Sequence, residues 1–160
     1  MNYAHIHLML NHAPIMGMGF GVLVLLWGLI RRNCEVVRTS FLLFMLAAVL
    51  AIPTFFTGEP ASDVLKNLPH FSEQTSEAHE EAALIALIFV GITGIISLIA
   101  YIRLITKKEC TAPLTIGILI IALITLGFFF RAGQLGGKIN HQELRPGFVM
   151  PAHTEDADKD

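Results

Sequence analysis

Three histidines and an asparagine stand near the beginning of the chain, directly before a long apolar segment. His5, His7 and His12 lie there together with Asn11 and Pro14. An imidazole at the boundary of a bilayer is costly unless it faces a protein interior or binds something. Neutral imidazole is also a common ligand of metal ions and of haem iron. This segment is therefore the first candidate for a functional site.

The chain has the composition of a membrane protein. Of its 160 residues, 54% are hydrophobic and only 15% are charged, unlike the usual mixture of soluble domains. A helix needs about 20 apolar residues to cross a bilayer, and open sheet edges cannot be satisfied in lipid. The sequence therefore predicts an all-α fold, an antiparallel four-helix transmembrane bundle. Its four apolar stretches are Ala13 to Ile30, Phe41 to Thr57, Ala82 to Ile102 and Pro113 to Phe130.

The predicted bundle makes up one domain, residues 1–145, and a polar tail follows at 146–160. The composition of the tail is typical of disorder. The first apolar stretch lacks the basic segment and the cleavage site of a signal peptide, so we expect it to remain as a helix. Cys34 and Cys110 lie in two loops without Cys-x-x-Cys spacing, which predicts two free thiols with no metal or redox role.

Helix-breaking and helix-capping residues predict where the helices begin and end. The second helix is expected to stop at Thr57-Gly-Glu-Pro60, because Gly and Pro together are strong breakers. The third is expected to begin at Ser72 and Glu73, which resemble a cap and an acidic first turn. The fourth is expected to run past Arg131 and to reach Gly133–Gly137, whose glycines either end the helix or let another backbone approach closely.

Charge predicts that both chain ends lie on the same side of the membrane. Six basic residues crowd into the two short loops after the first and third helices, against five elsewhere, and short basic loops are typically cytoplasmic. The opposite side holds eleven of the thirteen acidic residues. We therefore expect a multi-pass protein of a bacterial inner membrane with both termini in the periplasm. All seven histidines lie on that outer side: His5, His7, His12, His70, His79, His141 and His153.

Helical periodicity predicts which side chains face the bundle interior. At about 100° per residue, the first helix has one stripe of small and polar residues, and the third helix has another. His5 and His12 share a different face of the first helix, and both faces converge only if Pro14 bends it. The two stripes are His7, Asn11, Pro14, Met18, Gly21, Leu25 and Gly28, and His79, Ala83, Ala86, Val90, Thr93, Ser97 and Tyr101.

The outer end of the bundle offers candidate ligands for a b-type haem. We expect His12 and His79 to be the axial ligands, with His7 and His141 as substitutes. Arg131 is the candidate for pairing with a haem propionate. This interpretation makes the protein a membrane-bound electron carrier, although the sequence does not decide whether it is an enzyme.

Two alternatives stay open. A bare zinc, iron or copper ion would use histidines and carboxylates, which suit these metals. An accessory subunit of a larger membrane complex would bind no cofactor, and its rim histidines would simply reach toward water. In each case the lipid bilayer is a partner and nothing indicates nucleic acid. The candidate ligands of a bare metal ion are His7, His12, Glu59, His79, Glu80, His141 and Glu143.

Four short motifs, one near the outer end of each helix, resemble a family of small four-helix bacterial inner-membrane proteins. Some members of that family are fused to c-type cytochrome domains, which implies a redox setting, a haem, and a c-type cytochrome or a larger respiratory complex as partner. The chain departs from the family at Asn140, where relatives carry arginine. The motifs are His7-Leu-Met-Leu-Asn-His12-Ala-Pro14, Thr57-Gly-Glu-Pro60, Glu77-Ala-His-Glu-Glu-Ala82 and Leu135-Gly-Gly-Lys-Ile-Asn-His141-Gln-Glu143.

Overall fold

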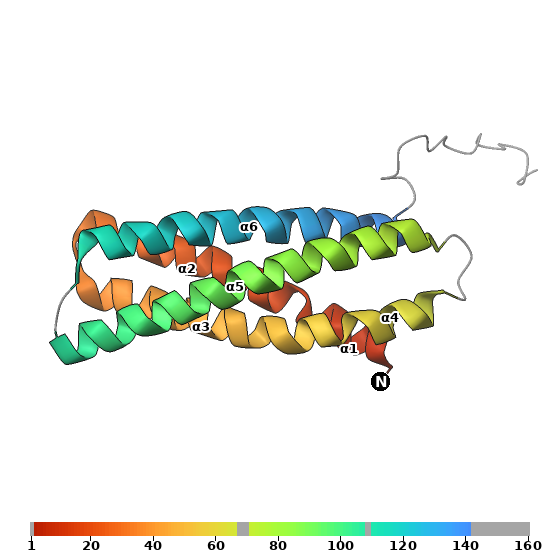
Figure 1. Ribbon diagram of the computed structural model, residues 1–160, viewed down its shortest axis with the longest axis horizontal. Coiled ribbons are helices and arrows are strands. Elements are labelled where there is room, and N and C mark those ends of the chain that lie inside the picture. Colours follow the sequence, from red (N-terminus) through yellow and green to blue (C-terminus); the bar gives the residue numbers. More distant parts are fainter. Residues whose placement is uncertain (1, 67–70, 108–109, 142–160) are drawn as a thin grey trace, which may run out of the picture.

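The computed structural model describes residues 2–66, 71–107 and 110–141, and this part of the chain is helical apart from its short connections (Figure 1). The predictions for His70, Glu143, His153 and the tail at 146–160 lie outside the described residues. The helices are α1 (Tyr3–Leu10), α2 (His12–Arg31), α3 (Cys34–Phe56), α4 (Gly58–Leu65), α5 (Glu73–Lys107) and α6 (Ala112–Asn140).

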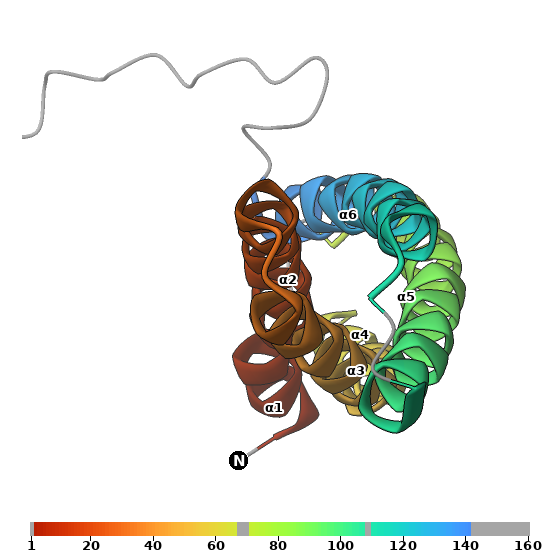
Figure 2. The same cartoon turned by 90° about the vertical axis from the view of Figure 1, so that its left-hand side faces the viewer.

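These helices form four units that are long and apolar enough to cross a membrane: 3–31, 34–65, 73–107 and 112–139. In the bundle, α2 packs between α3 and α6, and α5 also packs between α3 and α6. Figure 2 shows the resulting ring, in which α2 and α5 are diagonal. The predicted all-α four-helix bundle is confirmed. We call the end that holds α1 and α4 the histidine end, and the end that holds the α2–α3 turn the turn end.

The first membrane unit is divided at Asn11 because of Pro14. Proline has no N–H, so the carbonyl group of Leu10 has no helical donor. The hydroxyl of Thr54 in α3 lies 3.4 Å from this carbonyl oxygen and supplies a weak substitute. The chain therefore leaves one helix at Leu10 and enters the next at His12, which is the local distortion that the sequence allowed for.

The second membrane unit does not end where the sequence predicted. After Phe56 there is a single interruption at Thr57, and the chain then continues as α4 from Gly58 to Leu65. Pro60 lies in the first turn of α4. Backbone N–H groups in a first turn have no acceptor within their own helix, so a proline there costs no helical hydrogen bond. Gly58 and Pro60 thus restart a helix rather than stop one, and the predicted irregular connection is partly helical.

The predicted beginning of α5 is confirmed, and α6 decides between the two roles predicted for its glycines. Ser72 precedes α5, and its Oγ accepts a hydrogen bond of 3.3 Å from the backbone N–H of Thr75. In α6 the helix continues through Gly133–Gly137 to Asn140. The glycines therefore do not end this helix, and one of them packs against a histidine of α5.

The bundle interior combines small and hydroxyl-bearing side chains with a few large apolar ones such as Phe44, Met18 and Leu25, while many other large apolar side chains face outward. Thr93 of α5 and Thr125 of α6 are fully buried and hydrogen-bonded to each other at 3.0 Å. Ile30 is 71% exposed and Phe130 67% exposed, as expected for a surface in contact with lipid. The predicted stripes match most of the buried positions of α2 and α5, although Ala83 and Tyr101 are only half-buried. The buried residues are Pro14, Met18, Gly21, Val22, Leu25 and Gly28, and Ala82, Ala86, Val90, Thr93, Gly94, Ser97 and Ala100.

At the turn end, α2 and α3 are joined by a very short connection. Arg32 adopts a left-handed conformation with φ of 49°, and the backbone N–H of Asn33 donates to the carbonyl oxygen of Gly28 at 3.0 Å. The Asn33 side chain then caps α3 by accepting from the backbone N–H groups of Glu35 and Val36. The two helices are consequently in close contact immediately after the turn.

Candidate functional site

The imidazole of His7 is half-buried and is anchored on α3. Its Nδ1 lies 3.0 Å from the carbonyl oxygen of Thr54 and 3.2 Å from Oγ1 of Thr57. Because a carbonyl oxygen only accepts hydrogen bonds, Nδ1 must carry the proton. In the neutral imidazole, Nε2 then bears the lone pair and can act as a ligand.

Thr54 and Thr57 supply the polar atoms that contact the His7 imidazole. The Thr57 hydroxyl lies 2.9 Å from the carbonyl oxygens of both Pro53 and Thr54, so it donates to one of them and can accept from His7. The Thr54 hydroxyl donates to Leu50 at 2.8 Å. Sequence reasoning missed both threonines, although Pro53 indicated a disturbed helix end in this place.

His79 on α5 repeats this arrangement on α6. Its half-buried imidazole has Nδ1 2.8 Å from the carbonyl oxygen of Ala132. The same reasoning assigns the proton to Nδ1 and the lone pair to Nε2. The interaction crosses from the third to the fourth membrane unit, just as the interaction of His7 crosses from the first to the second.

A glycine follows each accepting carbonyl by four residues. A Cβ at Gly136 would lie 3.0 Å from Cε1 and 3.2 Å from Nδ1 of His79, and a Cβ at Gly58 would lie 3.5 Å from Cε1 of His7. Residue i+4 of a helix lies directly above carbonyl i, so a glycine there leaves the oxygen open to a neighbouring side chain. The motif of histidine, carbonyl and glycine therefore occurs once in each half of the chain.

The two imidazoles lie at the same end of the bundle. His7 lies on α1, which packs against α2, α3 and α4, and His79 lies in the first turns of α5; Figure 1 shows α1 and the beginning of α5 at the same end of the bundle. Asn11, one helical turn after His7, adds a buried Oδ1 that has no hydrogen-bond partner within the described residues.

The structure favours His7 over His12 as the partner of His79. His12 is exposed, because it lies five residues beyond His7 and thus about 140° around a helix. The predicted pair of His12 and His79 rested on a shared depth in the membrane, which does not fix the direction of a side chain. The remaining predicted residues in the described chain are also exposed: Glu59, Glu80, Arg131 and His141.

The donor set fits haem iron better than a bare metal ion. Within residues 2–66, 71–107 and 110–141, no three His, Cys, Asp or Glu side chains gather so that they could hold a metal ion. A zinc site needs three or four protein ligands. A six-coordinate haem needs only two axial ligands from the protein, and His7 and His79 are two half-buried imidazoles at the same end of the bundle.

Known proteins add no assignment to this site. Comparisons of the chain with models of protein families, with curated proteins and with solved structures found no match. The resemblance to small four-helix bacterial inner-membrane proteins therefore stays a prediction, and the function has to follow from the residues and their geometry.

Proposed function

We propose that this protein is a membrane electron carrier that binds a b-type haem through His7 and His79 at the histidine end. The observation that supports this most directly is the matched state of the two imidazoles. Each donates Nδ1–H to a main-chain carbonyl and keeps the lone pair of Nε2. A hydrogen bond of this kind fixes the orientation of a ligating imidazole and raises its basicity.

When bound, the haem would supply a reversible one-electron centre. The chain itself orients the ligands, because the imidazoles are held on α3 and α6 by hydrogen bonds to the carbonyl groups of Thr54 and Ala132. Gly136 gives the His79 ring its place against α6. Arg131 is exposed beside Ala132 in the sequence and is our candidate for pairing with a propionate.

The proposed setting is a bacterial inner membrane with the histidine end toward the periplasm. The apolar outer surface of the bundle suits a lipid environment. The proposed electron partner is a c-type cytochrome or a larger respiratory complex, which rests on the family resemblance alone.

An absorption spectrum of the purified protein, before and after addition of dithionite, tests the haem proposal. We expect the bands of a six-coordinate low-spin b haem and about one haem per chain, since one pair of axial ligands is present. Elemental analysis of the same sample is the control. Stoichiometric zinc, copper or non-haem iron in a colourless preparation would mean that the protein binds a bare metal ion and not haem. A preparation with neither, purified together with a larger complex, would instead support the accessory subunit.

The orientation is tested by labelling Cys34, which is exposed at the turn end. In a Cys110→Ser variant, a membrane-impermeant thiol reagent should leave Cys34 unmodified in intact spheroplasts, because we place the turn end in the cytoplasm. After permeabilisation the same reagent should label it fully. Labelling of Cys34 in intact spheroplasts would mean that the orientation is the opposite one, with the histidine pair on the cytoplasmic side.

A further inference from the structure

One face of α2 points away from the bundle and is apolar almost to the turn end. Leu23, Trp27 and Ile30 are exposed on this face, and Trp27, the only tryptophan of the chain, is 57% exposed. The buried positions of α2 lie on the opposite face. Tryptophan is typical of the headgroup level of a membrane. Trp27 therefore marks the depth at which lipid headgroups begin, one helical turn before α2 ends at Arg31.

Arg31 lies over the ring of Trp27. The central carbon of its guanidinium group is 5.6 Å from the centre of the ring. A cation within about 6 Å of an indole face is attracted by the π-electrons, and residues four apart are neighbours on one face of a helix. The contact holds the charge of Arg31 at headgroup depth. It uses no hydrogen-bond acceptor, so the N–H groups of the guanidinium can still donate to oxygen atoms of a ligand.

Arg31 and Arg32 carry two positive charges that no carboxylate of the described chain neutralises. Within residues 2–66, 71–107 and 110–141, neither arginine forms an ion pair or a side-chain hydrogen bond. Arg38, the next cation in the sequence, is paired with Glu35. Both Arg31 and Arg32 are exposed, and the left-handed conformation of Arg32 ends α2 beside them. The turn therefore presents two guanidinium groups next to a membrane-facing tryptophan.

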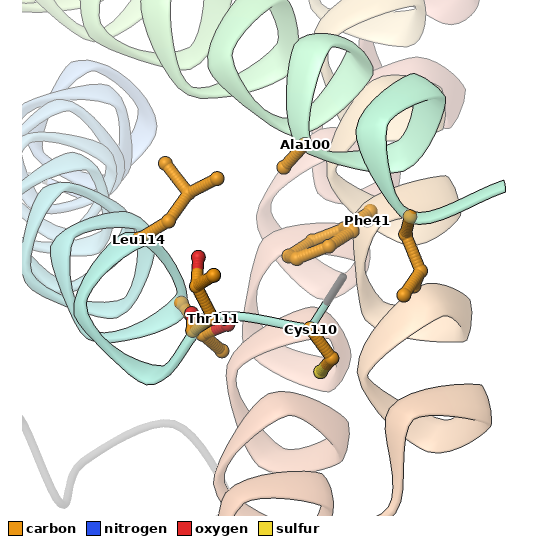
Figure 3. Close-up of a pocket in the computed structure, with 7 residues that line it drawn as sticks. Phe41, Ala100, Cys110, Thr111 and Leu114 are labelled. Atoms are coloured by element: carbon orange, nitrogen blue, oxygen red, sulfur yellow. Dashed lines mark hydrogen bonds between the residues drawn. The ribbon is translucent and has the colours of Figure 1, made fainter. Parts of the chain in front are cut away.

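The cavity at the turn end is too small to hold a ligand of these arginines. Phe41, Ala100 and Cys110 are among the residues that line it, and its volume is about 10 Å³ (Figure 3). Such a volume suffices for about one water molecule, and a phosphate group does not fit. The outer face of α2, in contrast, combines cations at headgroup depth with apolar side chains at acyl-chain depth.

We propose that Trp27, Arg31 and Arg32 form a binding site for the headgroup of an anionic phospholipid at the turn end. The guanidinium groups donate to phosphate oxygens, a pairing that arginine makes through two parallel hydrogen bonds. The acyl chains lie along Leu23, Trp27 and Ile30. Two positive charges near the membrane surface favour a lipid of net negative charge over a zwitterionic one. This proposal rests on neither the haem nor the membrane orientation.

Fluorescence of Trp27 tests the proposal, because a single tryptophan reports only on its own surroundings. The full-length protein is placed in vesicles of phosphatidylglycerol and phosphatidylcholine, and the acyl chains of one lipid or the other are brominated so that they quench indole fluorescence. At equal lipid composition, the two degrees of quenching give the relative occupancy of the two lipids beside Trp27. We expect phosphatidylglycerol to be preferred by at least about fivefold, the effect of roughly one basic residue at a membrane surface.

Two double variants separate a local site from a generally basic surface. Arg31→Gln/Arg32→Gln should lower the preference for phosphatidylglycerol to below about twofold, because both proposed donors are lost. The matched control is Arg103→Gln/Lys107→Gln, which also removes two charges from the turn end. These two residues are on α5, which is diagonal to α2 in the ring (Figure 2). The control should therefore keep the preference of the wild type.

Three results would overturn the proposal. The first is equal quenching of the wild type by the two brominated lipids. The second is an equal loss of preference in both double variants, which would mean a diffuse attraction and no site on α2. The third is a preference that disappears in sodium phosphate but persists in sodium chloride of the same ionic strength, which would assign the arginines to a soluble phosphate. Circular dichroism of each variant establishes that the helical bundle is intact.

Discussion

Replacing either His7 or His79 by alanine should abolish the spectrum of six-coordinate haem, whereas His12→Ala should leave it unchanged. Each of the first two changes removes one axial nitrogen, and the described residues offer no third inward imidazole at a matching position. His12 is the matched control because it carries the same side chain on the same membrane unit but is exposed. The measurement is the reduced-minus-oxidised spectrum together with the haem content per chain.

Addition of free imidazole separates a lost ligand from a lost fold. It should restore part of the six-coordinate spectrum in His7→Ala and His79→Ala, since a small imidazole can enter the space that the side chain has left. The opposite pattern, with His12→Ala colourless and His7→Ala unaffected, would assign the axial ligands to His12 and His79, as predicted from the sequence. Unchanged spectra in all three variants would mean that none of these histidines is a haem ligand.

Gly28→Ala should destabilise the bundle by about 1–3 kcal/mol, the usual range for overpacking. A Cβ at Gly28 would lie 2.8 Å from Cγ2 and 2.9 Å from the backbone nitrogen of Val37. The side chain of Val37 can turn away, but its backbone nitrogen cannot move without shifting the beginning of α3. The adjacent turn permits little adjustment, because Asn33 is hydrogen-bonded to the carbonyl oxygen of Gly28 itself.

Gly127→Ala is the control for this measurement. It lies in α6, and a Cβ there would have no heavy atom within 4 Å outside the helix backbone and its chain neighbours. Alanine is favoured over glycine in a helix by up to about 1 kcal/mol, so this variant should be neutral or more stable. Unfolding in SDS from mixed micelles compares the two. Equal stabilities of Gly28→Ala and wild type would mean that α2 and α3 are less closely packed than the structure shows.

The fold could be predicted because helical periodicity determines which side chains can be buried. Pro14, Met18 and Leu25 recur at spacings of four and seven residues, and all three are buried. The same rule found the buried face of α5. The continuation into α4 could not be predicted in this way, because Gly58 and Pro60 are compatible both with the end of one helix and with the first turn of another.

The candidate site could be predicted only in part. His79 and His7 lay on the predicted inward stripes, yet His12, on another face of the first helix, was the predicted partner of His79. The choice depends on the carbonyl groups of Thr54 and Ala132, which are accepting partners only because particular helices are neighbours.

The placement of the histidine partners has a consequence for how the protein is made. His7 is synthesised before its acceptor on α3, and His79 is synthesised before its acceptor near the end of α6. Synthesis proceeds from the N-terminus, and helices associate after they have entered the membrane. The imidazole of His7 can therefore be fixed once α3 has been inserted, whereas that of His79 is fixed only when the last helix has been inserted. A ligand that depends on both of them can be bound only after translation has passed Ala132, so its delivery is a step that follows membrane insertion.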